Sequence, residues 1–284
     1  MKFSGHTNAT YGYSTEEAID LFVSLGFDGM DIGCNDLSGV TIETAVSRRR
    51  EIAAYAQDKG LVISNLACYA GGEAGFTSLH PAVRRETMRQ VQEHIRLAKD
   101  LDCKQVRVFP GRDTGEGIAE GERGFQLAVE AYQDLSRFAE EFDVTLLVEN
   151  HPMTITVTAQ QTVDLVKAVD RENVRILYDP SNLIVYAGEQ DVESNFHIQK
   201  DYIAYVHMKD QLLLKDGRYA DTVIGRGVIP WGNILRLLYE AGYEGFLAME
   251  YQRGRQSTER LPDPDIGLKE GLAFLKGLLR TLEG

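Results

Sequence analysis

Short apolar segments alternate with helical periodicity along the whole chain, and this alternation constrains the fold more than any other feature. Seven segments have the length and residue content of buried strands, and a weaker one opens the chain. They cover residues 2–4, 27–33, 61–68, 105–109, 144–148, 174–178, 203–206 and 246–249. Between them, apolar residues recur every three or four positions, as at Met88, Val91 and Ile95. The chain therefore predicts strands and helices in alternation.

Alternation of this kind is typical of a parallel sheet, and eight strands are the number that closes a (β/α)₈ barrel. An open doubly wound sheet is the alternative, but such a sheet usually carries a nucleotide-binding motif. No G-x-G-x-x-G follows the first strand, and no P-loop motif occurs. No linker or shift in composition divides the 284 residues. We therefore predict an α/β fold, a single TIM-barrel domain over residues 1–284.

The charge balance narrows the range of partners. A net charge of −13 at pH 7 disfavours nucleic acid and anionic membranes. No apolar run could span a bilayer and no signal sequence is visible, so we expect a cytoplasmic protein. Cys34, Cys68 and Cys103 are odd in number and lack C-x-x-C spacing, which argues against a disulfide framework or a zinc knuckle. We interpret them as small core residues.

The last four predicted strands end in side chains that can bind metals. These are Glu149 in VTLLVE, Asp179 in RILYD, His207 in AYVH and Glu250 in FLAME. Each alone could be an ordinary strand exit, but in a barrel such ends converge on the catalytic face. Three carboxylates brought so close would raise one another's pKa values unless a cation compensated. We therefore predict a divalent-metal site, with Mn²⁺ preferred and Mg²⁺, Co²⁺ or Zn²⁺ as alternatives. A substrate that chelates through neighbouring oxygens, such as a sugar or hydroxyketone, would fit it.

Five segments carry a resemblance to a known family. LVENHP, LYDPSN, YVHMKD, GRGVIPW and FLAMEY, in this order and spacing, resemble the xylose isomerase-like TIM barrel superfamily of sugar-phosphate isomerases and epimerases. The resemblance covers most of the chain and is strongest over residues 144–251. It implies that Glu149, Asp179, His207 and Glu250 hold the metal, and that the two glutamates exchange protons with the substrate. It also implies a small sugar or keto-polyol substrate and a homodimer or homotetramer.

The implied activity is isomerisation or epimerisation through an enediolate, in which carboxylates remove and return a proton. A metal-dependent dehydratase or other lyase, similar to inosose dehydratase, is the main alternative. DNA cleavage, as in the endonuclease IV branch, requires additional histidine ligands, whereas this chain has six histidines. A non-catalytic sugar-binding barrel would not need both glutamates.

Further side chains near the strand ends and in the two longest loops, 69–80 and 210–230, are candidate substrate contacts. They are Asn182, His151, Lys209, Arg226, Arg107, Tyr69 and Trp231. Several also have an ordinary explanation: a charge partner for Lys209 and Arg226, a loop hydrogen bond for His151, and packing of the loops for Tyr69 and Trp231. Both loops are candidate lids. Asn182 stands where some ketose epimerases carry a histidine that touches a substrate oxygen, so it departs from their pattern. We give little weight to His6 and interpret His80, His94 and His197 as surface or helix positions.

Overall fold

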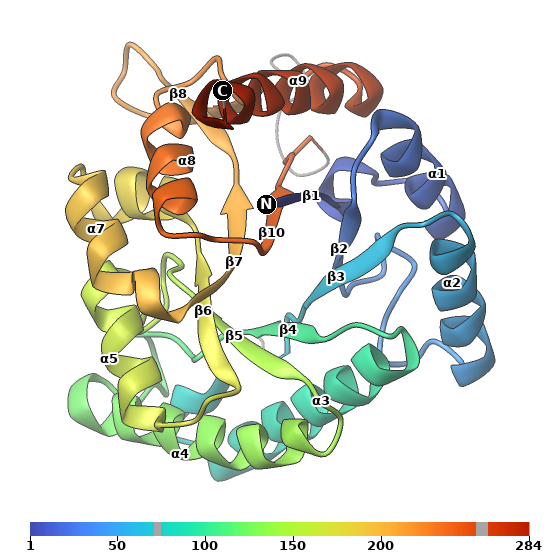
Figure 1. Ribbon diagram of the computed structural model, residues 1–284. Coiled ribbons are helices and arrows are strands. Elements are labelled where there is room, and N and C mark those ends of the chain that lie inside the picture. The colour runs from blue at the N-terminus through green and yellow to red at the C-terminus, as the bar shows by residue number, and fades with distance from the viewer. Residues whose placement is uncertain (71–74, 254–260, 284) are drawn as a thin grey trace.

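Eight parallel strands close into a barrel, and helices surround it (Figure 1). The computed structural model describes residues 1–70, 75–253 and 261–283. Around the barrel the strand order is β1-β10-β7-β6-β5-β4-β3-β2. The strands are β1 Lys2–His6, β2 Gly29–Gly33, β3 Val62–Ala67, β4 Gln105–Val108, β5 Thr145–Glu149, β6 Val174–Tyr178, β7 Ile203–Met208 and β10 Phe246–Met249. The predicted (β/α)₈ barrel is therefore confirmed, and each predicted strand is present with ends shifted by a few residues.

Helices connect successive strands and cover the outside of the barrel (Figure 1). They are α1 Thr15–Leu25, α2 Val46–Asp58, α3 Pro81–Asp100, α4 Gly121–Glu140, α5 Ala159–Val169, α6 Pro180–Asn182, α7 Val192–Gln199, α8 Trp231–Glu240 and α9 Pro264–Glu283. Local sequence signals set several of their ends. Ser14 and Glu17 form a capping box that satisfies backbone N–H groups at the start of α1. Gly26, with φ of 82°, ends α1 in the left-handed conformation that glycine adopts without strain.

The inside of the barrel is filled by a small cluster of apolar side chains. The cluster comprises Leu147, Leu177, Tyr205 and Ala248, from β5, β6, β7 and β10. Because side chains alternate between the two faces of a strand, the residue two positions further along points to the same side. Those residues are Glu149, Asp179, His207 and Glu250. One packed layer therefore directs all four toward the same end of the barrel.

The segment after β7 folds into a hairpin rather than an irregular loop. It contains the antiparallel strands β8 Asp210–Leu213 and β9 Tyr219–Thr222. The Asp210 carboxylate accepts hydrogen bonds from the backbone N–H groups of Gly225, Gly227 and Ile229, at 2.9, 3.0 and 3.1 Å. These bonds hold the end of the segment, residues 225–229, against the first residue of the hairpin. Of the other candidate lid, residues 71–74 lie outside the described residues, and Gly75–Thr77 form a buried 3₁₀ turn.

Gly227 occupies a position in this segment where a side chain does not fit. A Cβ there would lie 2.1 Å from Oδ1 of Asp210 and 2.5 Å from the backbone oxygen of Gln211. We expect Gly227→Ala to lower the free energy of unfolding by about 1–3 kcal/mol in urea denaturation, as overpacking does. Gly277→Ala in α9 is the control, because among the described residues no atom outside the neighbouring residues and backbone of α9 lies within 4 Å of its Cβ position. Equal loss in the two variants would contradict the explanation.

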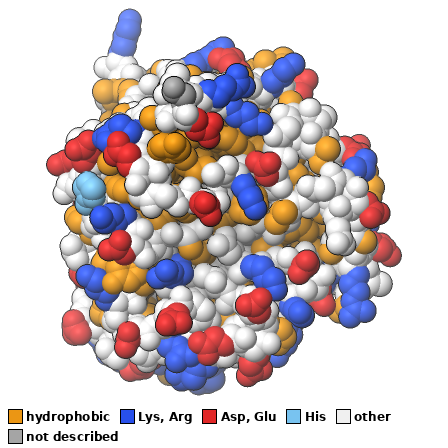
Figure 2. Space-filling view, viewed as in Figure 1, with side chains coloured by type: hydrophobic (Ala, Val, Ile, Leu, Met, Phe, Trp, Pro, Cys, Tyr) orange, Lys and Arg blue, Asp and Glu red, His pale blue; other side chains and the backbone are white. Residues whose placement is uncertain are grey.

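Three sequence-based expectations about burial and the surface can be compared with the structure. Cys34, Cys68 and Cys103 are free thiols and all are buried, as predicted. No helix among the described residues is both long and apolar enough to cross a membrane. On the face seen in Figure 2, Lys and Arg side chains are interspersed with Asp and Glu rather than gathered in one basic patch.

Candidate active site

Four polar side chains meet at the carboxyl ends of the strands, where the sequence placed them. Potential ligand atoms of Glu149, Asp179 and His207 lie within 4.8 Å of one another. Glu250 joins this group, since its Oε2 lies 3.8 Å from Nδ1 of His207. Nζ of Lys209 lies between two of the carboxylates, 2.7 Å from Asp179 and 2.9 Å from Glu250. The group is thus a buried, densely charged cluster.

Among the described residues, three buried atoms of this cluster have no hydrogen-bond partner: Oε2 of Glu149, Oδ2 of Asp179 and Nδ1 of His207. The first two face the cations Arg107 and Lys209, whereas Nδ1 of His207 faces only carboxylates. A buried polar atom without a partner costs roughly 1–3 kcal/mol, so such atoms mark a place where a ligand can be bound. Three carboxylates and one imidazole, without a thiolate, form a donor set that suits a hard or borderline divalent cation. The residues therefore fit the predicted metal ion.

Arg107 of β4 is the second buried cation of the site. Its Nε lies 3.3 Å from Oε2 of Glu149. The guanidinium carbon lies 4.0 Å from the ring centre of Phe109 and 4.7 Å from that of Tyr69. Both distances are within the range of cation–π attraction, which stabilises the positive charge of this buried guanidinium. Of the sequence-predicted candidates, Arg107 therefore lies beside Glu149, and Tyr69 packs against Arg107.

Neighbouring cations keep both glutamates ionised. Burial raises the pKa of Glu149, but interaction with the charges of His151 and Arg107 outweighs burial and lowers this pKa to about 2. Because burial also lowers the pKa of His151, Arg107 is the one of these two groups that stays charged near neutral pH. Burial likewise raises the pKa of Glu250, but Lys209 is the main group that brings it well below its usual range. Both carboxylates are therefore unprotonated near neutral pH, which is the state that a proton acceptor requires.

Asn182 and His151 flank Glu149 on the chain segments that follow β6 and β5. The Asn182 amide donates to Oε1 of Glu149 at 3.4 Å and to the backbone oxygen of Asn150 at 3.0 Å. Nδ1 of His151 lies 2.8 Å from the backbone oxygen of Pro152, which is the loop hydrogen bond considered in the sequence analysis. Asn182 thus helps to orient the carboxylate, and His151 is anchored beside it.

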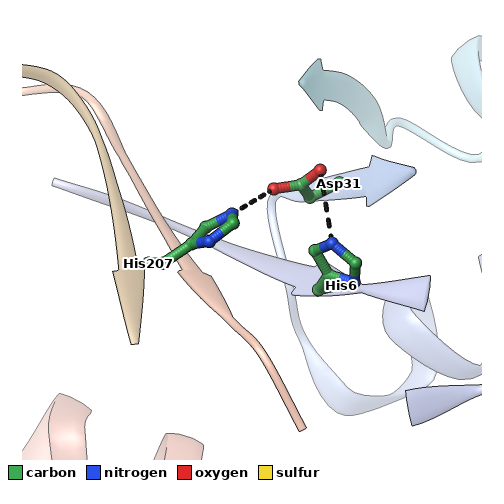
Figure 3. Close-up of side chains that lie close together, drawn as sticks. All are labelled: His6, Asp31 and His207. Carbon is green, nitrogen blue, oxygen red and sulfur yellow. Dashed lines mark hydrogen bonds and ion pairs between the residues drawn. The ribbon is translucent and has the colours of Figure 1, made fainter. Parts of the chain in front are cut away.

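Asp31 and His6 also belong to this cluster (Figure 3). Asp31 was not among the predicted site residues, and His6 was given little weight. Asp31 of β2 is fully buried, and its Oδ2 lies 2.9 Å from Nε2 of His207. His6 of β1 is also fully buried, with Nε2 3.9 Å from Oδ1 of Asp31. A carboxylate inside the apolar segment 27–33 was the signal that could have revealed Asp31, because ionised groups are rarely buried without a partner.

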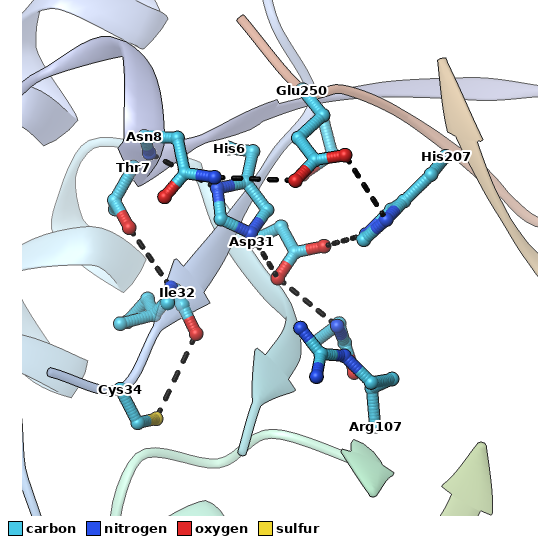
Figure 4. A network of polar contacts seen from close by, with 12 residues as sticks. His6, Thr7, Asn8, Asp31, Ile32, Cys34, Arg107, His207 and Glu250 are labelled. Atoms are coloured by element: carbon cyan, nitrogen blue, oxygen red, sulfur yellow. Dashed lines mark hydrogen bonds and ion pairs between the residues drawn. The ribbon is translucent and has the colours of Figure 1, made fainter. Parts of the chain in front are cut away.

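Glu250 is held in place by side chains from three parts of the chain. One of them, Asn8, is seen beside Glu250 in Figure 4. Its Oε1 accepts hydrogen bonds from Nδ2 of Asn8 at 3.2 Å and from Nε2 of Gln252 at 2.6 Å. Its Oε2 accepts from Nζ of Lys209. Asn8 follows β1, so the first and last strands of the barrel are connected at the site. These contacts fix the direction of the carboxylate more firmly than a strand end alone would.

Three other residues take structural positions. Arg226 lies at the surface in a bidentate ion pair with Glu270 of α9, at 2.6 and 2.7 Å, which is the ordinary explanation considered for it. Trp231 begins α8 and is 1% exposed, so it packs in the core instead of presenting a ring to a ligand. His94 lies on α3 as expected but is buried rather than at the surface.

Protons should compete with a metal ion for this site. Burial lowers the pKa of His207, but the neighbouring carboxylates of Asp31 and Glu149 raise it to about 10, and burial raises the pKa of Asp179 to about 6. Raised pKa values mean that both groups hold their protons more tightly, so a cation must displace them. We expect metal affinity to increase about tenfold per pH unit between about 6 and 10, and more steeply below about 6.

Titration calorimetry with Mn²⁺ in buffers of different ionisation enthalpy measures both the affinity and the protons released. An affinity that does not change with pH over this range would show that His207 does not exchange its proton for the metal.

Known proteins resemble this chain in sequence and in fold. The family model described as xylose isomerase-like TIM barrel matches residues 19–278. A D-psicose 3-epimerase from Enterocloster bolteae is 26% identical over 241 residues, which are 82% of this chain and 75% of that protein. An inosose dehydratase from Clostridium botulinum is 30% identical over 265 residues, 84% of this chain and 82% of that protein.

A solved structure shows the same architecture. The crystal structure of a D-psicose 3-epimerase in the presence of D-fructose superimposes with a TM-score of 0.82, covering 98% of this chain and 99% of that one. The two sequences are 17% identical, so this similarity concerns the fold alone.

Proposed function

Because this chain belongs to the xylose isomerase-like TIM barrel family, we propose that it is an enzyme that isomerises or epimerises a sugar or keto-polyol with the help of a divalent metal ion. Glu149, Asp179, His207 and Glu250 would hold the ion, with Mn²⁺ preferred over Mg²⁺, Co²⁺ and Zn²⁺. When bound, the ion would stabilise the negative charge that develops on the substrate oxygen as the neighbouring carbon loses its proton. Relatives named D-psicose 3-epimerase and inosose dehydratase support chemistry on a carbohydrate or polyol.

The observation that carries the proposal is the pair of ionised carboxylates around one imidazole. Glu149 follows the inner face of β5 and Glu250 follows that of β10, and two strands, β6 and β7, separate them in the barrel. Oε1 of Glu149 and Oε2 of Glu250 nevertheless lie 3.4 and 3.8 Å from the same Nδ1 of His207. A small ligand bound beside the proposed metal ion would therefore have two proton acceptors within reach.

Two acceptors are what inversion at carbon requires. One carboxylate takes the proton from the carbon beside a carbonyl, and the other, after taking up a proton from water, gives that proton to the opposite face, which produces the epimer. The first carboxylate then releases its proton to water, so that no net proton is consumed. Return of the proton to the neighbouring carbon would give the aldose–ketose isomer. We propose Glu149 and Glu250 for these roles, with the hydrogen bonds from Asn8 and Gln252 keeping Glu250 directed at the substrate.

Substrate contacts are proposed for the remaining polar groups that surround the two glutamates. They are Arg107, Lys209, His151, Asn182 and Tyr69. The amide of Asn182 can donate a hydrogen bond to a substrate oxygen but does not change charge near neutral pH. The guanidinium and ammonium groups would neutralise negative charge on the substrate or on the intermediate. Arg226 and Trp231 are left out because of their positions in the surface ion pair and in the core.

Exchange of substrate C–H for deuterium tests the proposal. The protein is incubated in D₂O with Mn²⁺ and, separately, with ketoses, phosphorylated ketoses and inososes, and NMR follows the loss of each C–H signal. We expect exchange at a carbon beside the carbonyl, and loss of that exchange after chelation. Absence of exchange on every compound would contradict an isomerase or epimerase acting on these substrates.

Dehydration is the second candidate, since the inosose dehydratase from Clostridium botulinum is 30% identical over most of its length. Here the same proton removal would be followed by loss of a β-hydroxyl group, which gives an unsaturated product. The NMR experiment separates the two, because a dehydratase produces a vinylic signal and water, whereas an epimerase or isomerase conserves the composition of its substrate.

Cleavage of DNA is less well supported. The endonuclease IV branch relies on additional histidine ligands, but His80 and His197 are exposed and His94 hydrogen-bonds to a carbonyl within its own helix, α3. The net charge of −13 also opposes binding to a phosphate backbone. A barrel that only binds sugar would not need two ionised carboxylates beside the same imidazole.

A further inference from the structure

Asp31 is a buried carboxylate that the proposed reaction does not use. It lies on β2 with no exposed surface. Its Oδ1 accepts a hydrogen bond from Nδ2 of Asn65 at 3.0 Å, and its Oδ2 lies 2.9 Å from Nε2 of His207. Burying an ionised carboxylate costs free energy unless hydrogen bonds and cations compensate. Both oxygens of Asp31 have such partners, and one of them is a residue of the proposed metal site.

The contact with Asp31 determines which nitrogen of His207 carries hydrogen. An ionised carboxylate only accepts hydrogen bonds, so Nε2 of His207 must donate. In the neutral ring the lone pair then lies on Nδ1. This nitrogen faces Oε1 of Glu149 at 3.4 Å and Oε2 of Glu250 at 3.8 Å, and it has no hydrogen-bond partner. The ring is therefore oriented with its lone pair toward the other proposed ligands.

His6, Asp31 and His207 also lie close enough together to suggest a metal site of their own (Figure 3). The hydrogen bond at the far side of His6 argues against that role. Its Nδ1 accepts from the backbone N–H of Asn8 at 3.0 Å, so the hydrogen of the neutral ring must lie on Nε2. Nε2 is the atom that points to Asp31, and with its hydrogen it cannot bind a cation. A metal there would require His6 to give up the bond to Asn8 or to become an anion.

We propose that Asp31 is a positioning residue that holds His207 in the Nε2–H form and so presents Nδ1 to the divalent cation. The inference rests on the metal site of the proposed function. Carboxylates that accept from the second nitrogen of a metal-binding histidine fix its tautomer and increase its basicity, and their loss typically lowers metal affinity about 10–100-fold. His6 fills space beside Asp31 and is not a ligand.

Metal affinity, rather than activity, is the measurement that tests this role. We would titrate the wild type, Asp31→Ala, Asp31→Asn and His6→Gln with Mn²⁺ at one fixed pH, and determine the stoichiometry of each. The wild type should bind one equivalent. Asp31→Ala should bind about 10–100-fold more weakly, and His6→Gln should stay within about threefold of the wild type.

Asp31→Asn is the conservative variant, and it keeps the test informative if Asp31→Ala does not fold. Oδ1 of Asn65 has no hydrogen-bond partner, so a turned Asn65 amide can accept from the new side chain. The new carbonyl oxygen then remains available to His207 Nε2. Asp31→Asn should therefore unfold at a temperature close to that of the wild type and recover part of the lost affinity.

Nitrogen NMR of the Zn²⁺-loaded protein gives an independent measurement. The wild type should show a slowly exchanging Nε2–H of His207, and this signal should broaden or disappear in Asp31→Ala. A role of Asp31 in stability alone would leave both the tautomer and the metal affinity unchanged.

The outcomes separate this inference from the proposed function. Normal affinity in Asp31→Ala, with one equivalent bound to the wild type, would disprove the positioning role and leave the metal site intact. Two equivalents in the wild type, or complete loss of binding in both Asp31→Ala and His6→Gln, would make Asp31 and His6 ligands and overturn the inference. A wild type that binds no metal would overturn the metal site and the positioning role together.

Discussion

Glu149→Gln and Glu250→Gln are each expected to lower turnover at least ~100-fold, the lower end of what general acid–base catalysis contributes. Glutamine keeps the size and part of the hydrogen bonding of each side chain but cannot accept a proton from carbon. Turnover is measured with the substrate identified by deuterium exchange, at saturating Mn²⁺. Near-normal turnover in either variant would remove that residue from the proton-transfer role.

Loss of metal affinity could lower turnover for another reason, because both glutamates are also proposed ligands. Deuterium exchange distinguishes the two causes. If the glutamates act on opposite faces of the substrate, each epimer should still exchange its proton in the variant that retains the carboxylate on its own side. A variant that has lost its metal would exchange neither epimer. Glu270→Gln removes a carboxylate from the surface ion pair with Arg226 and should leave turnover unchanged.

Removal of the divalent metal is expected to have the larger effect, a loss of roughly 1000-fold or more. A cation that stabilises charge on a substrate oxygen contributes several kcal/mol, and each 1.4 kcal/mol corresponds to about a tenfold change in rate. Without it, Lys209 would be the main cation between Asp179 and Glu250, and an ammonium is a weaker electrostatic partner than a divalent ion.

Chelation followed by metal analysis and readdition of Mn²⁺, Co²⁺, Mg²⁺ or Zn²⁺ measures this effect and shows which ion restores most activity. Full turnover at less than roughly a tenth of an equivalent of bound metal would show that the reaction does not depend on the ion. Asp179→Asn complements the experiment, since Asp179 is a proposed ligand without a proposed part in proton transfer. It should weaken metal binding, and excess Mn²⁺ should restore part of the turnover.

Much of the fold and the convergence of the charged strand ends could be predicted because the signals are local. Apolar runs separated by amphipathic periods predict the strands and helices, and eight strands predict closure. Alternation along each strand then relates Leu147 to Glu149 and Tyr205 to His207, so the inward direction of a strand end follows from the sequence. The positions of the strand ends were enough to predict which four side chains come together, namely Glu149, Asp179, His207 and Glu250.

Contacts across the barrel could not be predicted in this way. Asp31 lies in the second strand and His207 in the seventh, and only the closed ring brings them to 2.9 Å. The sequence alone likewise left Arg226 and Trp231 open between a site and an ordinary structural position, because the tertiary structure decides the ion pair of Arg226 with Glu270 and the burial of Trp231. The chain by itself thus determined the order of strands and helices and the chemistry at the strand ends. The tertiary structure decided which charged groups are paired, because pairing depends on how strands distant in sequence approach one another when the barrel closes.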